Sequence, residues 1–160
     1  MTNLDLKSLI GSDPYLQARQ QELQRREMER KGREDLPYLM QSILYPLAQG
    51  ENRKPLGALH RRVEKFLNRL EERRRAGTGK KVIGILLLPR EHLKTTLVTV
   101  AWTIQRLLVN PDARVFLSNE KLDNSKKFLR SIKEQFERNE LFRRIYGNWV
   151  PVGEERSGGF

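Results

Sequence analysis

The sequence contains no cysteine and only two histidines, His60 and His92. The lack of cysteine excludes disulfides, zinc–thiolate sites and thiol catalysis, and two histidines are too few for the common histidine-rich metal sites. The longest apolar run, residues 83–88, is far too short to cross a bilayer, and the N-terminus has no apolar core that would mark a signal peptide. We therefore expect a soluble protein in a cytosolic setting, with no membrane partner.

Acidic side chains are also few relative to basic ones. The 160 residues include 20 Asp and Glu and 31 Lys and Arg, which gives a net charge of +11. The basic excess is spread along the chain. Such a protein attracts polyanions by releasing their counterions, so DNA, RNA and anionic lipid are all candidate partners. The length suits one domain that is large enough to bury a core.

The first half of the sequence reads as helical. Residues 17–34 are a dense polar run that predicts a solvated helix, and residues 36–47 predict a short apolar helix between two prolines. Apolar residues then recur at helical spacing over 59–70, which predicts an amphipathic helix. It ends in Arg73, Arg74 and Arg75, which either cap the helix or contact DNA.

The second half changes character. Residues 82–88 are apolar at nearly every position, as in a strand buried on both faces of a parallel sheet. A helical pattern over 96–109, a second strand over 113–118 and a third helix from about 123 follow. Strand, helix, strand and helix in succession predict right-handed crossovers and a parallel sheet.

A phosphate-binding loop is predicted between the first strand and its helix. Such a loop needs backbone N–H groups at a helix start, a Lys for the β- and γ-phosphates, and a neighbouring Ser or Thr for Mg²⁺. Lys94 and Thr95 supply the last two. The usual glycines are absent, because Leu88 and Leu93 stand where the standard spacing would place them.

The segment 89–96 resembles the N-terminal ATPase region of phage terminase large subunits, the motors that package DNA. Many members of that family carry a deviant Walker A of the form P-R-G-H-G-K-S/T-T directly after an apolar strand. Two positions depart from the glycines of that form, Glu91 and Leu93. The positions that match are Pro89, Arg90, His92, Lys94, Thr95 and Thr96. The resemblance extends over roughly residues 55–147.

The resemblance implies an α/β fold with a P-loop NTPase-type parallel sheet, preceded by a helical extension. The expected organisation is a helical extension over 1–55, the N-terminal part of an ATPase domain over 56–147, and an irregular, truncated tail over 148–160. ATP and Mg²⁺ would be bound by residues 89–96, with Thr95 on the metal. Lys94 and Arg90 would be the catalytic residues, Arg90 acting in its own subunit or on a neighbour.

The function implied is that of an ATPase that drives viral DNA into procapsids in the host cell cytoplasm. The partners implied are double-stranded DNA, the terminase small subunit, the portal or procapsid, and further copies in a homo-oligomeric ring. No apolar run followed by Asp or Glu, as a Walker B motif requires, occurs after residue 118. That motif and a nuclease domain would lie beyond Phe160, so we expect a fragment or an abbreviated product that binds nucleotide better than it hydrolyses it.

Two other functions remain open from the sequence. A basic helical nucleic-acid-binding module would bind DNA in a salt-sensitive way without ATP. A helicase-like NTPase fragment would instead move along single strands and need no procapsid.

Overall fold

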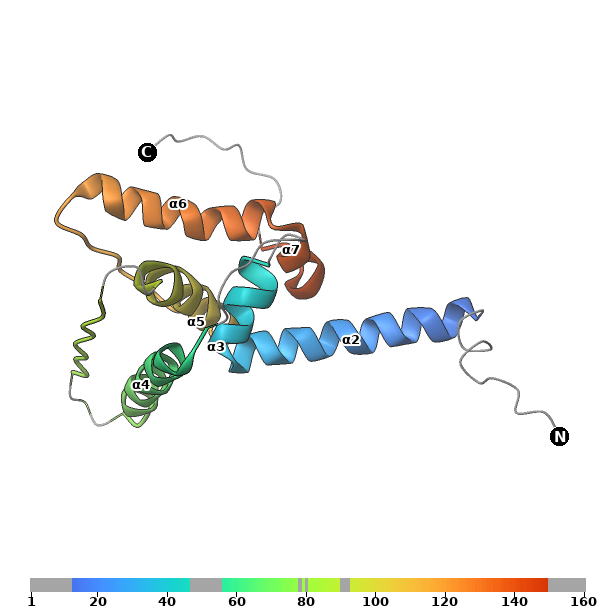
Figure 1. Cartoon of the computed structure of the whole chain (residues 1–160), viewed down its shortest axis with the longest axis horizontal. Coiled ribbons are helices and arrows are strands. Elements are labelled where there is room, and N and C mark those ends of the chain that lie inside the picture. Colours follow the sequence, from blue (N-terminus) through green and yellow to red (C-terminus); the bar gives the residue numbers. More distant parts are fainter. Residues whose placement is uncertain (1–12, 47–55, 78, 80, 90–92, 150–160) are drawn as a thin grey trace.

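The computed structural model describes residues 13–46, 56–77, 79, 81–89 and 93–149. Within these ranges every regular element is a helix (Figure 1). In chain order they are α2 (Pro14–Glu34), α3 (Leu36–Tyr38), η1 (Leu39–Leu44), α4 (Ala58–Arg75), η2 (Thr95–Trp102), α5 (Thr103–Val109), α6 (Leu122–Arg138) and α7 (Glu140–Tyr146). Both η1 and η2 have π-helical hydrogen bonding. η1 continues directly from α3, and η2 continues directly into α5.

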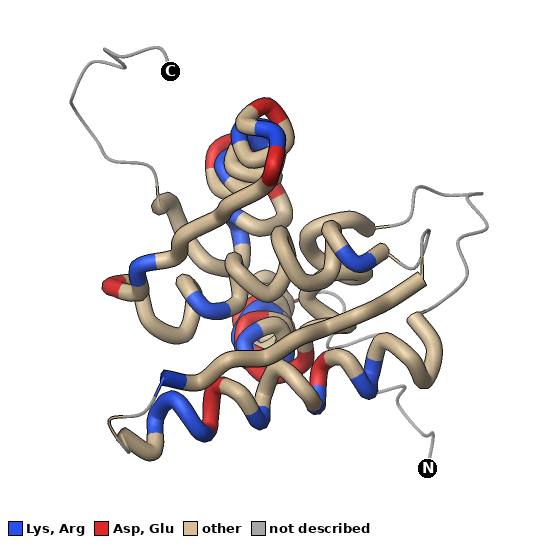
Figure 2. Tube along the Cα trace, turned by 90° about the vertical axis from the view of Figure 1, so that its left-hand side faces the viewer, with Lys and Arg blue, Asp and Glu red and all other residues tan. Residues whose placement is uncertain are grey.

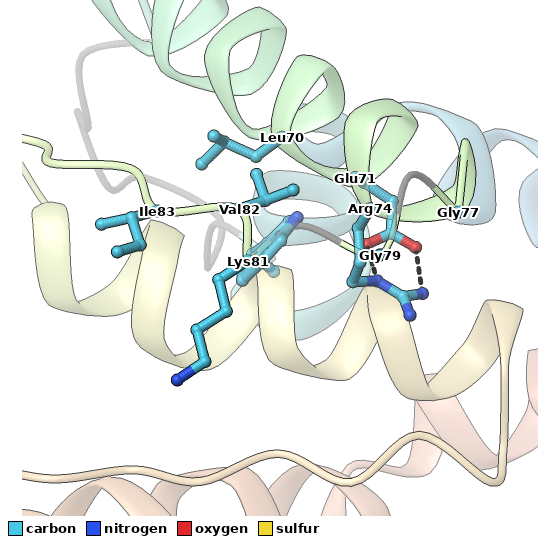
Figure 3. A pocket seen from close by; sticks show the side chains of 9 residues that line it. Leu70, Glu71, Arg74, Gly77, Gly79, Lys81, Val82 and Ile83 are labelled. Carbon is cyan, nitrogen blue, oxygen red and sulfur yellow. Dashed lines mark hydrogen bonds and ion pairs between the residues drawn. The ribbon is translucent and has the colours of Figure 1, made fainter.

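The predicted parallel sheet is wrong for the described part of the chain. Residues 82–88 and 113–118 are extended, but neither forms a strand and no backbone hydrogen bond joins them. Helix η2–α5 lies between the two segments in Figure 3. The helix that was expected to cover one face of a sheet therefore separates the segments that would have formed it.

The segment 81–89 explains why apolar content misled the prediction. It runs alongside α4 (Figure 2), and a Cβ at Gly84 would meet the side chains of Leu70 and Phe66. Its side chains alternate, because Leu86 and Leu88 pack against the core while Ile83, Ile85 and Leu87 are 81%, 78% and 88% exposed. An uninterrupted apolar run predicts burial on both faces, yet helices cover one face only here.

Helix η2–α5 forms the centre of the core. Leu97, Ala101 and Ile104 are fully buried on it, and α3–η1, α4 and α6–α7 supply the side chains packed around them. The helical spacing of the apolar residues over 96–109 thus predicted this helix correctly. The remaining buried apolar side chains are Leu36, Leu39, Met40, Ile43, Leu44, Val63, Leu67, Val100, Leu108, Ile132, Phe142 and Ile145.

Helix α2 begins at a conventional N-cap, where the carboxylate of Asp13 accepts a 2.8 Å hydrogen bond from the backbone N–H of Tyr15. Glu–Arg and Glu–Lys pairs one turn apart follow along it, as the polar sequence predicts. Its first half projects away from the other helices (Figure 1). Its second half docks on α7, where Arg25 donates a 2.7 Å hydrogen bond to the carbonyl of Ile145.

Asn139 fixes the turn between α6 and α7. Its carbonyl Oδ1 accepts from the N–H of Phe142 at 2.9 Å, which caps α7, while its Nδ2 donates to the carbonyl of Ile43 at 2.9 Å. Phe142 is thereby held in the core against Phe136, with ring centroids 5.1 Å apart. From residue 150 onward, the expected irregular tail over 148–160 lies outside the described residues. Residues 1–12 of the expected helical extension lie outside them as well.

Candidate functional site

The described part of the predicted phosphate-binding loop turns sharply at Leu93. This residue has φ 51°, and among the described non-glycine residues no other has a positive φ. The left-handed region costs a leucine about 1–2 kcal/mol, and the side chain of Leu93 is 44% exposed. The terminase motif has glycine at this position, and the backbone of this chain adopts the conformation that glycine favours.

The first turn of the helix that follows Leu93 carries no acidic group. Lys94 is the N-cap residue of η2, and its side chain makes no capping hydrogen bond. The first backbone N–H groups of a helix lack intrahelical partners, and they carry the positive end of the helix dipole. The carbonyl of Leu93 accepts from the N–H of Leu97 at 2.8 Å, which ties the turn to the buried part of the helix.

The structure brings together only part of the predicted site. Lys94 is exposed, and Thr95 and Thr96 are half-buried on the first turn of η2. Pro89 is exposed at the end of the extended segment. Arg90, Glu91 and His92 lie outside the described residues. The two cavities described next are not lined by residues 93–96.

One cavity of about 720 Å³ lies where the extended segment 81–89 begins (Figure 3). Leu70, Glu71 and Arg74 of α4, Lys81 and Val82 of the segment, and Trp102 of η2 line it. Figure 3 shows Arg74 turned onto Glu71, where its Nε and Nη2 atoms donate at 2.9 and 2.7 Å. Both sides of this cavity are mixed, because Lys81 lies beside Val82 on the segment and Leu70 lies beside Glu71 and Arg74 on α4.

A second cavity, of about 440 Å³, shares Glu71, Arg74 and Trp102 with the first and extends across α5 to residues 110–116. We call it the arginine pocket. Four guanidinium groups line it, and two aromatic rings and two carboxylates complete its charged and aromatic lining. These side chains are Arg74, Arg75, Arg106, Arg114, Trp102, Phe116, Glu71 and Asp112.

Glu71 is the centre of charge in this pocket. Arg74 approaches its carboxylate to 2.7 Å, Arg75 to 3.0 Å and Arg106 to 4.0 Å. The hydrogen bond from Arg74 holds the pKa of Glu71 at about 2, well below the usual value, and Arg75 and Arg106 act in the same direction while burial opposes them. Burial lowers the pKa of Arg106, and the proximity of Arg75 and Arg74 adds to this, against the attraction of Glu71.

Sequence reasoning marked Arg74 and Arg75 as a cap or a DNA contact, but it missed Arg106, Trp102 and Phe116. The signal for Arg106 was present, because this arginine, next to Gln105, interrupts the apolar pattern of the helix between Ile104 and Leu107. A charged group at such a position needs a polar partner or a cavity. No sequence pattern reports the approach of residues 110–116 to the end of α4.

No group of three or more His, Asp or Glu side chains with metal-binding geometry occurs among the residues that the structure describes. In the same ranges, none of the helices combines the length and the apolar character needed to cross a membrane. Comparison with protein-family models, with curated proteins and with solved structures gives no match to this chain.

Proposed function

We propose that this chain is the ATP-binding part of a DNA-packaging motor of the terminase large-subunit type, and that residues 89–96 hold the triphosphate of Mg-ATP. The observation that carries the proposal is the left-handed backbone of Leu93 immediately before a helix start that bears Lys94 and Thr95. Phosphate binding at a helix start needs free N–H groups, a cation and a hydroxyl, and all three are found within this one turn. It does not require the parallel sheet.

Each residue of the proposed phosphate-binding loop has a separate role. Lys94 neutralises the β- and γ-phosphates, the hydroxyl of Thr95 is a ligand of Mg²⁺, and the N–H groups of the first turn of η2 bind phosphate oxygens. Arg90 stabilises the charge that develops during hydrolysis, in its own subunit or in a neighbouring one. In the assembled motor the chain acts in the host cytoplasm as a homo-oligomeric ring with the small subunit, the procapsid portal and double-stranded DNA.

Calorimetric titration with Mg-ATP tests this proposal. Lys94→Ala should weaken binding about ten- to hundred-fold, because a hydrogen bond to a charged group contributes about 1.5–3 kcal/mol. Lys126→Ala is the matched control, since it removes the same charge from an exposed position on α6. Absence of Mg-ATP binding by the wild-type protein at millimolar concentration, or equal losses in the two variants, would refute nucleotide binding at this loop.

A second candidate is a basic helical module that binds nucleic acid without nucleotide. It is favoured by the helical character of the described chain and by the three arginines in the last turn of α4. This module would bind DNA weakly, without sequence preference and with steep salt dependence, and its binding would survive Lys94→Ala and ignore ATP. A helicase-like fragment would instead translocate along single strands in the absence of procapsids.

A further inference from the structure

The arginine pocket has more positive charge than its own carboxylates can neutralise. Arg74, Arg75, Arg106 and Arg114 line it against Glu71 and Asp112, which leaves an excess of two positive charges around one cavity. Glu71 is already shared among three of the arginines. An unbalanced cluster of guanidinium groups in a partly enclosed cavity is stabilised by an anion, and the planar guanidinium matches phosphate oxygens best.

Two buried hydrogen-bond donors on side chains that line the pocket have no partner among the described residues. These are Nε of Arg106 and Nε1 of Trp102, both shielded from solvent. The Arg106 side chain is only 15% exposed, and apart from its 4.0 Å approach to Glu71 its guanidinium donates to Gln105 Oε1 at 3.1 Å. A buried guanidinium with this little compensation is costly, so a ligand that supplies negative charge would relieve it.

Apolar and aromatic side chains share the exposed part of the pocket with the charged ones. Phe116 is 89% exposed and Val115 is 44% exposed, and both line the same cavity as the four arginines. With 89% of its surface exposed, the Phe116 ring contributes little to the core and is accessible to a ligand. Beside a phosphate-binding cluster, such a ring is a stacking surface for a nucleobase.

We propose that the arginine pocket binds single-stranded nucleic acid, with a phosphodiester group among Arg75, Arg106 and Arg114 and a neighbouring base stacked on Phe116. An acidic peptide would satisfy the arginines but would leave the ring unused, and a base within a duplex cannot offer its face to the ring. The site goes beyond ATP binding by the loop, because it lies about two to three turns further along the η2–α5 helix and needs no nucleotide.

Fluorescence anisotropy with a short labelled oligo(dT) measures the proposed binding. The pocket pair Arg75→Ala/Arg114→Ala should weaken binding about ten-fold or more and reduce the salt dependence accordingly. The control pair Arg73→Ala/Arg130→Ala removes the same charge from exposed positions outside the pocket and should change the affinity less than about three-fold. Equal losses in the two pairs would mean that only net charge attracts the strand, and the proposal would fall.

Phe116→Ala separates nucleic acid from other anions. Loss of one stacked base should weaken oligo(dT) binding about five-fold or more, and this loss should persist at high salt because stacking is not screened. An unchanged affinity at high salt would overturn the assignment. Thymidine monophosphate is the competing probe, and the strand is the ligand only if the mononucleotide competes much more weakly than the oligonucleotide.

Glu71→Gln gives an opposite effect that a merely structural role would not produce. The amide keeps the shape of the side chain but no longer neutralises Arg74, Arg75 and Arg106. Oligo(dT) affinity should therefore rise several-fold, whereas Glu72→Gln, on the next residue of the same helix and outside the pocket, should have a smaller effect. Weaker binding by Glu71→Gln, with circular dichroism unchanged, would contradict a phosphate site at this position.

Discussion

The backbone N–H of Leu36 donates a 2.8 Å hydrogen bond to Oε1 of Glu64, and both groups are buried. The bond joins the start of α3 to the middle of α4. Arg61 completes the junction, with contacts of 2.8 Å to Asp35 and 3.2 Å to the other oxygen of Glu64. A carboxylate within the core thus caps one helix from another.

Glu64→Ala should therefore destabilise the protein by about 1–3 kcal/mol, because it leaves the buried N–H of Leu36 without an acceptor. Glu64→Gln keeps a carbonyl oxygen in place as an acceptor and should lose clearly less stability than Glu64→Ala. Urea denaturation followed by circular dichroism measures both free energies. Equal stability of the alanine and glutamine variants would show that the capping bond contributes nothing.

Gly32→Ala tests the contact between α2 and α7. A Cβ at Gly32 would overlap the hydroxyl of Tyr146 and lie 3.1 Å from Cδ1 of Ile43. Alanine gains about 1 kcal/mol in helix propensity, but overpacking costs about 1–3 kcal/mol, so we expect a net loss of thermal stability. Tyr146→Phe removes the hydroxyl, so the double variant should regain most of the thermal stability that Gly32→Ala loses. A double-mutant cycle measures this coupling between the two positions.

Leu93 supplies a prediction for the candidate site. Leu93→Gly should keep Mg-ATP binding and leave the melting temperature equal or higher, because glycine adopts φ 51° without strain. Leu93→Val should weaken Mg-ATP binding and lower the melting temperature, since a β-branched residue is poorly tolerated in the left-handed region. Identical nucleotide affinities for these two variants would show that the left-handed turn has no part in binding.

Stability at acid pH should depend on Glu71. Its pKa in the folded protein is about 2, against a usual value of 4.5, chiefly because of the hydrogen bond from Arg74. A lowered pKa stabilises the fold above pH about 4.5, and this contribution is lost as the pH falls towards 2. Thermal melts at pH 7 and pH 3 should show a smaller acid loss for Glu71→Gln than for the wild type, with Glu72→Gln as the control.

The exposed side chains of the segment 81–89 predict self-association. Ile83→Thr, Ile85→Thr and Leu87→Thr together should raise solubility and lower binding of a hydrophobic dye, with little effect on the melting temperature. Leu86→Thr is the contrasting variant, because Leu86 packs on the core and its loss should reduce stability. A large stability loss in the triple variant would contradict the exposed arrangement.

The helices could be predicted from the sequence because their information is local. The spacing of Val63 and Leu67 on α4, and of Leu97 and Ile104 on η2–α5, identifies which face is buried without knowledge of the partner. The two extended segments are a different case. Their apolar content indicates extended backbone, but which neighbour receives it depends on contacts between residues distant in sequence.

The candidate site likewise has a part that depends on local sequence and a part that depends on contacts between distant residues. The sequence placed a phosphate-binding loop before the helix that starts at Lys94, because a short motif and its neighbours suffice for that prediction, but the left-handed backbone of Leu93 was not predicted. The arginine pocket was out of reach, because Arg75 and Arg114 stand 39 positions apart and line one cavity only in the folded chain. Pockets built from separate elements have no spacing that a sequence pattern can report.

The docking of α7 on α2 has a consequence for synthesis on the ribosome. Phe142 and Ile145 complete a core whose other members begin at Leu36, and Arg25 on α2 is bound to the carbonyl of Ile145. A nascent chain that has not yet released α7 from the exit tunnel can pack α3 and η1 against α2, α4 and η2, but the surfaces of η1, α2 and α6 that α7 covers stay exposed. The core would therefore be completed only when Ile145 emerges, and chaperones that bind apolar segments could act on these surfaces until then.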